Sequence, residues 1–227
     1  MTDIEQEMAE RFYGFGRWRA PYWFIGPEPG QAKKEDDKLE HRARAWSKCG
    51  KPELTDLKEY HDYLEPGLHT REKAGLQSTW KKLLLTLLAY KDHEYKNQSS
   101  VVEDRRSYQR LSLGHADGET CLVELSGLPA NSSYTIRERE RFLPARVRRL
   151  RAALTEKLKS PSPGFVVMYG TGSQNHFESI FGSALKQDRV VRVDSTVVVL
   201  ATHPNTRGIT NQYWIALGKS LREQGKK

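Results

Sequence analysis

The chain has 227 residues, 37% of them hydrophobic, and its mean hydropathy of −0.73 is that of a polar globular protein. No apolar run approaches the roughly 20 residues that a membrane-spanning helix needs, and the acidic N-terminal residues do not resemble a secretory signal. Two cysteines are too few for a disulfide framework or a cysteine-ligated cluster, so we expect a cytoplasmic protein.

The charge balance is basic. With 37 Lys and Arg residues against 29 Asp and Glu residues, the chain has a formal net charge of +8 and a pI of about 9.4. This balance favours a polyanionic partner, with nucleic acid ahead of a membrane surface. The alternative is a basic protein that has no such partner.

Aromatic residues are concentrated between Phe12 and Trp23, where the first predicted strand begins. We expect most of these rings to pack around that strand. Two arginines interleaved with them, Arg17 and Arg19, also suit contact with phosphates while the rings stack on bases. Packing is the interpretation we favour, with nucleic-acid contact as the alternative.

A buried strand is predicted at residues 22–25, and the Gly-Pro-Glu-Pro-Gly sequence at 26–30 then forces a sharp turn. Proline fixes φ and removes an amide donor, whereas glycine permits positive φ or a close approach of the backbone. Glu28 is therefore held at the carboxyl end of a strand, which is where ligands bind in α/β sheets. The alternative is a Pro-Gly turn that carries a solvated glutamate.

Residues 31–96 are charged and helical in pattern, with breaks near Gly50 and Pro66. The best helix is predicted near 78–90, where tryptophan and leucine recur at helical spacing and would face the core. We treat residues 36–117 as a helical insertion into one domain that covers the whole chain. The histidines of this region lack metal-ligand spacing, and no metal or other cofactor is predicted.

A second strand is predicted at 120–125, and turn-forming residues follow it at 126–133. Within that turn, Asn131 could cap the next helix or present its amide to a ligand, since an amide has both a donor and an acceptor. An arginine-rich helix is then predicted at 137–159. Its charged face is either solvated or in contact with phosphates.

The third strand, at 165–169, leads into a Gly-Thr-Gly-Ser sequence that only weakly resembles a phosphate-binding loop. The fourth, at 195–201, leads into Thr-His-Pro-Asn at 202–205 and then a helix at about 211–223. Four strands separated by helical segments predict an α/β fold, a three-layer αβα sandwich around a four-stranded, mainly parallel sheet.

The carboxyl ends of parallel strands share one edge of a sheet, so the polar residues that follow these strands should converge on one cleft. The candidates are Glu28, Asn131, His203 and either Gln174 or His176. A carboxylate opposite a histidine suits hydrolysis of a bond whose leaving group becomes anionic. The carboxylate would orient or deprotonate water, and the histidine would donate a hydrogen bond to the departing atom.

The turn at 26–30 and the Thr-His-Pro-Asn sequence at 202–205 resemble two motifs of the uracil-DNA glycosylase superfamily and occur in its order. The resemblance covers approximately residues 20–35 and 118–220. It implies the superfamily's four-stranded parallel αβα fold, and hydrolysis of an N-glycosidic bond after the nucleotide is flipped out of DNA.

By this resemblance, Glu28 positions the water that attacks the sugar C1′, and His203 stabilises the departing base. The segment that ends at Asn131 supplies a base-reading amide, and Arg207 lies in the loop that is inserted into the duplex. The site residues expected from the sequence are Glu28 and His203 for catalysis; Gly26, Pro27, Gly30, Asn131, Gln174 and Asn205 for the base; and Arg17, Arg19, Ser132 and Arg207 for DNA.

The chain also departs from the superfamily pattern. Gly30 stands where uracil-specific members have a tyrosine that blocks substituents at C5, so a 5-substituted pyrimidine could fit. Glu28 is longer by a methylene than the Asp or Asn that is usual at its position. Members with an iron–sulfur cluster need more cysteines than this chain has.

We therefore expect a monomeric, monofunctional DNA glycosylase of the bacterial cytoplasm that acts on a bulky 5-substituted pyrimidine. The chain is similar to anti-phage glycosylases that remove glucosylated 5-hydroxymethylcytosine from phage DNA, and residues 36–117 could line a pocket for the sugar. The alternatives are a repair glycosylase for uracil or 5-hydroxymethyluracil, a non-catalytic DNA-binding module, and an α/β enzyme that acts on a free nucleotide.

Overall fold

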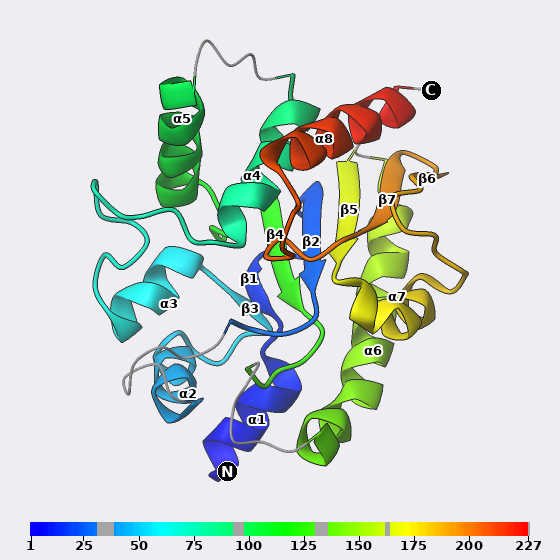
Figure 1. Ribbon diagram of the computed structural model, residues 1–227. Coiled ribbons are helices and arrows are strands. Elements are labelled where there is room, and N and C mark those ends of the chain that lie inside the picture. Colours follow the sequence, from blue (N-terminus) through cyan, green and yellow to red (C-terminus); the bar gives the residue numbers. More distant parts are fainter. Residues whose placement is uncertain (31–38, 93–97, 130–135, 162–163, 227) are drawn as a thin grey trace.

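The computed structural model describes residues 1–30, 39–92, 98–129, 136–161 and 164–226. These residues form an α/β fold in which a seven-stranded sheet has helices on both faces (Figure 1). The strand order is β3-β1-β4-β2-β5-β7-β6. The predicted α/β class is therefore confirmed.

The four strands predicted from the sequence form the centre of the sheet: β4 (Thr120–Glu124), β2 (Tyr22–Gly26), β5 (Gly164–Tyr169) and β7 (Thr196–Ala201). Each is parallel to its neighbours within this group. Parallel strands are covered by helices on both faces, so their residues are apolar without alternation. Every residue of β5 and β7 is buried, which is why their sequences show them clearly.

The prediction of a four-stranded, mainly parallel sheet was wrong, because three short strands extend the sheet and make it mixed. β1 (Gly14–Gly16) and β6 (Val191–Val193) run antiparallel to β4 and β7, while β3 (Leu54–Thr55) is parallel to β1. Strands of two or three residues are too short to show alternation in the sequence. At Gly14, where φ is +141°, a Cβ would lie 2.1 Å from the carbonyl oxygen of Leu122, so β1 needs glycine to approach β4.

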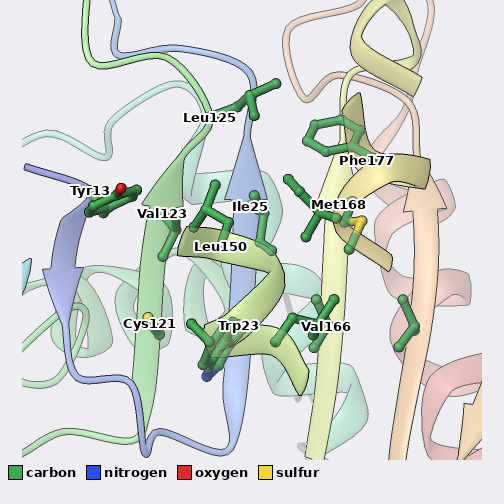
Figure 2. Packing of buried hydrophobic residues seen from close by; sticks show 14 of the residues in the cluster. Tyr13, Trp23, Ile25, Cys121, Val123, Leu125, Leu150, Val166, Met168 and Phe177 are labelled. Atoms are coloured by element: carbon green, nitrogen blue, oxygen red, sulfur yellow. The ribbon is translucent and has the colours of Figure 1, made fainter. Parts of the chain in front are cut away.

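One face of the sheet is covered by α6 (Ile136–Leu158) and α7 (Gln174–Phe181). Figure 2 shows Leu150 of α6 and Phe177 of α7 packed with side chains of the central strands in one buried cluster. The arginine-rich helix predicted at 137–159 is therefore confirmed as α6, with its leucine stripe against the sheet.

The opposite face is covered by α4 (Trp80–Tyr90) and α8 (Asn211–Gly225), which also pack against each other (Figure 1). Leu83, Leu84 and Leu87 of α4 are buried in this layer. The helix predicted near 78–90 from its leucine spacing is confirmed. The central sheet thus lies between two helical layers.

The other helices lie beside these layers. α1 (Asp3–Arg11), α2 (Leu39–Lys48) and α3 (Leu57–Leu64) share a third buried cluster, and α5 (Gln98–Leu111) packs against α4. Residues 36–117 therefore supply α4, a layer of the main core, as well as peripheral helices. No helix in the described part of the chain is long and apolar enough to cross a membrane.

β2 and β5 are neighbouring parallel strands whose connections run over opposite faces of the sheet. The connection that follows β2 includes α4 on one face, and the segment after β5 leads to α7 on the other. Ligands of open α/β sheets commonly bind where neighbouring parallel strands diverge in this way, outside their carboxyl ends. The carboxyl ends of β2 and β5 are therefore the first place to look for a functional site.

Candidate functional site

Four polar side chains stand at the carboxyl ends of the four central strands. Glu124 is the last residue of β4 and Tyr169 is the last residue of β5, whereas Glu28 and His203 each follow a strand by two residues. The register of the parallel strands places these ends level with one another. We call Glu28, Glu124, Tyr169 and His203 the carboxyl-edge site.

The turns that follow β2 and β7 meet at Gly170, the residue directly after β5. A Cβ at Gly170 would lie 3.4 Å from the ring of Pro27 and 3.7 Å from Cδ2 of His203. The centroid of the His203 ring lies 5.7 Å from that of Tyr169. The structure thus brings together the two turns that carry Glu28 and His203.

Gly26 leaves room for the polar groups of two neighbouring strands. A Cβ at this position would lie 2.3 Å from the Tyr169 hydroxyl oxygen and 2.5 Å from Oε2 of Glu124. Both polar atoms therefore converge on the end of β2, and any larger residue at Gly26 would displace them. This explains why a glycine, and not merely a turn former, begins the Gly-Pro-Glu-Pro-Gly sequence.

The Glu124 carboxyl group is buried in an unusual way. Oε2 of Glu124 is inaccessible to solvent and has no hydrogen-bond partner in the described part of the chain. Burial raises the pKa of Glu124 well above its usual range, against the opposing effect of Arg146, and Glu28 raises that pKa further. A carboxyl group in this environment is protonated, and therefore able to donate a hydrogen bond, at a pH where an ordinary glutamate is ionised.

Glu28 is half-buried and is held by an arginine of α6. Nη1 of Arg139 in α6 donates to Oε2 of Glu28 over 3.1 Å, while Nε of Arg139 is buried with no hydrogen-bond partner among the described residues. The arginine face of α6 was expected to be solvated or to contact phosphates. Arg139 instead restricts the orientation of the carboxylate in the turn after β2.

His203 has a defined tautomer when it is neutral. Nδ1 of its ring accepts a hydrogen bond of 3.1 Å from the backbone N–H of Asn205, so the proton of the neutral ring is on Nε2. Burial lowers the pKa of His203, which favours the neutral ring at physiological pH. The residue is therefore a neutral Nε2–H donor.

Two residues expected to contact a base make other interactions. Both hydrogen bonds given by Nε2 of Gln174 are local, one to Glu178 and one to the carbonyl oxygen of Leu185, each 2.9 Å long. The side-chain amide of Asn205 donates to the Thr79 hydroxyl over 3.3 Å. In this arrangement both amides stabilise the fold around the site.

The remaining expected residues fall into four groups. Among the described residues, no atom lies within 4 Å of a Cβ placed at Gly30. Arg207 is exposed in the turn that carries His203. Arg17 and Arg19 precede β2 and so lie toward the opposite edge of the sheet from Glu28. Two further expected residues, Asn131 and Ser132, lie outside the described residues.

No family model, curated protein or solved structure matched the chain when it was compared with each of them. The functional interpretation therefore depends on the geometry of the carboxyl-edge site.

Sequence reasoning missed three residues of this region: Arg139, Glu124 and Tyr169. A signal for Glu124 was present, because a glutamate that ends an otherwise apolar strand is placed where its carboxyl group is difficult to solvate. Arg139 gave no such signal, since its partner Glu28 is 111 residues away in the sequence. Together the site offers a carboxylate fixed by an arginine, a neutral imidazole N–H donor, and a carboxyl and a hydroxyl group able to bind a polar ligand.

Proposed function

We propose that this protein is a monofunctional DNA glycosylase that hydrolyses the N-glycosidic bond of a flipped-out pyrimidine nucleotide. The observation that carries the proposal is the pairing of two groups on adjoining turns. Glu28 is a carboxylate oriented by Arg139, and His203 is a neutral Nε2–H donor. The four-stranded parallel centre of the sheet and the sequences of both turns are also those expected of the uracil-DNA glycosylase superfamily.

In the proposed reaction, water attacks C1′ of the sugar while the bond from C1′ to the base nitrogen breaks. The Glu28 carboxylate orients this water and takes up its proton, and it also stabilises the oxocarbenium-like sugar. The electron pair of the broken bond leaves with the base, whose oxygen accepts a hydrogen bond from Nε2–H of His203. A neutral histidine keeps its proton, so it stabilises the anionic base without transferring a proton to it.

Arg139 is a positioning residue in this scheme. The Glu28 side chain has more rotatable bonds than aspartate, and an unrestrained glutamate would place water less reproducibly. The 3.1 Å bond from Arg139 fixes one carboxylate oxygen and leaves the other to contact water. This restraint offers a physical reason why the site can use glutamate.

Glu124 and Tyr169 are suited to binding the base itself. A protonated carboxyl group has a donor and an acceptor side by side, and it can match the N3 and C4 substituent edge of either cytosine or uracil. Oε2 of Glu124 is closed to solvent, so in this scheme the carboxyl group turns toward the base and its unpartnered oxygen gains a hydrogen bond. A base that leaves this oxygen unpaired would bind less tightly, because an unsatisfied buried polar group costs free energy.

We favour a bulky 5-substituted pyrimidine as the substrate, with glucosylated 5-hydroxymethylcytosine in phage DNA as the best candidate. Gly30 supports this choice, because glycine has no side chain to block a substituent on the base and no described atom lies within 4 Å of a Cβ placed there. The alternative substrates are uracil and 5-hydroxymethyluracil. The net charge of +8 and the exposed Arg207 beside the site support DNA as the partner, and we expect a monomer that acts in the bacterial cytoplasm.

Alkali-revealed strand cleavage tests the proposal with DNAs that contain uracil, 5-hydroxymethyluracil, 5-hydroxymethylcytosine or its glucosylated form. The wild-type protein should cleave one substrate, and Glu28→Gln should lower the rate by roughly 10²- to 10⁴-fold, the usual contribution of a general base. Glu59→Gln, which alters an exposed carboxylate on α3, is the matched control and should keep the wild-type rate.

Three outcomes would contradict the proposal. DNA binding without an abasic product on any substrate would favour a non-catalytic DNA-binding module. Cleavage of free nucleosides or nucleotides with no activity on DNA would favour an α/β enzyme of nucleotide metabolism. Equal rates for wild type and Glu28→Gln would show that the chemistry occurs at another site.

A further inference from the structure

A second site lies toward the opposite edge of the sheet from Glu28. A cavity of about 520 Å³ is bordered by residues that precede β2 and by the last turns of α6. Its lining residues are Trp18, Arg19, Arg149, Ala153, Glu156, Lys157 and Ser160. The proposed glycosylase reaction uses none of these residues.

Lys157 is the most informative member of this group. Only 4% of the residue is exposed, and its ammonium group makes no hydrogen bond or ion pair with any described residue. Nζ of Lys157 is only 3.2 Å from the position that a Cβ of Gly164 would occupy, which places the amine at the start of β5. Burial lowers the pKa of Lys157. A cation that is poorly solvated and has no partner in the protein is unfavourable, and an anion in the cavity would reduce this cost.

The other charges around the cavity are arranged so that a net positive charge remains. Arg149 donates to Glu53 over 2.7 and 2.5 Å, and its guanidinium lies 4.9 Å from the centroid of the Trp18 ring. These contacts neutralise Arg149 and fix it as part of the wall. Glu156 is paired with the exposed Lys159, which directly follows α6. Arg19 is exposed at the rim and has no partner in the described part of the chain.

We propose that this cavity binds the phosphomonoester of a nucleotide-sized ligand. Two unneutralised cations, Lys157 and Arg19, match the two negative charges of a phosphomonoester better than the single charge of a carboxylate or phosphodiester. The volume exceeds that of a bare phosphate, and Trp18 and Ala153 provide an apolar wall for the attached organic group. The phosphomonoester belongs either to a free nucleotide or to the 5′ end of a DNA strand.

Isothermal titration calorimetry tests this site with inorganic phosphate, deoxycytidine 5′-monophosphate and deoxycytidine. The nucleotide should bind, and the nucleoside without phosphate should not. Lys157→Met should weaken nucleotide binding at least tenfold, and Arg19→Gln should weaken it several-fold. Lys219→Met, which removes an exposed lysine of α8, is the matched control and should bind like the wild type.

A short oligonucleotide with and without a 5′-phosphate identifies the source of the ligand. Tighter binding of the phosphorylated strand than of the mononucleotide would assign the site to DNA ends, and the reverse would assign it to free nucleotides. Equal affinity in wild type and both cavity variants would overturn the proposal, as would an absence of binding heat at millimolar concentration.

Because Arg19 is at the exposed rim, its variant tests the site even if Lys157→Met fails to fold. Glu28→Gln should bind the nucleotide normally, which separates this site from the proposed catalytic one.

Discussion

Arg146 and Glu124 are neighbouring ionisable residues with buried polar atoms, and they differ in how far those atoms are hydrogen-bonded. Arg146 is completely buried, yet its guanidinium donates to the carbonyl oxygens of five residues, Ala9, Glu10, Phe12, Glu124 and Leu125. The side chain of Glu124 has a buried oxygen with no hydrogen-bond partner in the described residues. The protein therefore satisfies one buried group fully and leaves its neighbour unsatisfied.

This difference indicates a structural role for Arg146 and a ligand-binding role for Glu124. The five acceptors of Arg146 lie at the end of α1 and the end of β4, so one side chain of α6 ties these two segments together. Its guanidinium also lies 4.2 Å from the centroid of the Tyr13 ring. Each of its three nitrogens donates to at least one backbone carbonyl, so this group is committed to the fold. An unsatisfied carboxyl group at the carboxyl edge of the sheet is, by contrast, ready to bind one.

Removing the satisfied group should have the largest effect on stability. Arg146→Leu leaves up to five carbonyl oxygens without their donor, and we expect it to lower the free energy of unfolding by about 3–5 kcal/mol. Urea denaturation of the purified variant measures this loss. Arg148→Leu is the control, because Arg148 is an exposed residue of the same helix and should change stability by less than about 0.5 kcal/mol.

A loss below about 1 kcal/mol in Arg146→Leu would mean that water or a rearranged backbone replaces the arginine. In that case the hydrogen bonds of Arg146 would not distinguish it as a structural residue from Glu124 as a ligand-binding one.

Removing the unsatisfied group should affect the proposed reaction instead. Glu124→Ala deletes the donor and acceptor that we assign to the base, and we expect the rate of base release to fall by roughly 10- to 100-fold. Glu124→Gln keeps an uncharged donor and acceptor and should retain most of the activity. Single-turnover rates on the preferred DNA substrate measure both variants.

The pH profile sharpens this second test. Wild-type activity should fall as pH rises through the raised pKa of Glu124, because the ionised carboxylate cannot donate a hydrogen bond. Glu124→Gln should lack this decline. If Glu124→Gln is as inactive as Glu124→Ala, the reaction requires the ionised carboxylate and the assigned role is wrong.

The parts of the fold that could be predicted are the fully buried strands and helices, because burial requires apolar residues in a recognisable pattern. β7 is buried at every residue, so its run of valines identifies a central parallel strand. β1 has only three residues and depends on glycine for its approach to β4, and neither property gives a strand signal. The sheet was therefore predicted at its centre and missed at its edges.

The candidate site was also predictable only in part. Strand–turn patterns place Glu28 and His203 at one edge, because parallel strands end together. They do not show that Arg139 pairs with Glu28, or that the amides of Gln174 and Asn205 are used locally. Such pairings depend on how α6 and the loops pack in three dimensions. Residue type and spacing therefore predicted which turns carry the site. The ion pair and hydrogen bonds of its side chains could be found only from the structure.

The smallest expected effect concerns the pH dependence of stability, which tests Glu124 without any substrate. The pKa of Glu124 is raised in the folded protein, so its contribution to stability is fully present below its unfolded value of 4.5 and is lost as pH rises through the folded pKa. Each unit between the two values corresponds to about 1.4 kcal/mol.

Glutamine does not titrate, so Glu124→Gln should gain stability relative to the wild type as pH increases from 4 to 8. Urea denaturation at several pH values measures this difference, and Glu59→Gln should show none of it. A constant difference between wild type and Glu124→Gln would mean that the carboxyl group ionises normally, and the protein would then have no neutral acid at the carboxyl edge with which to bind a base.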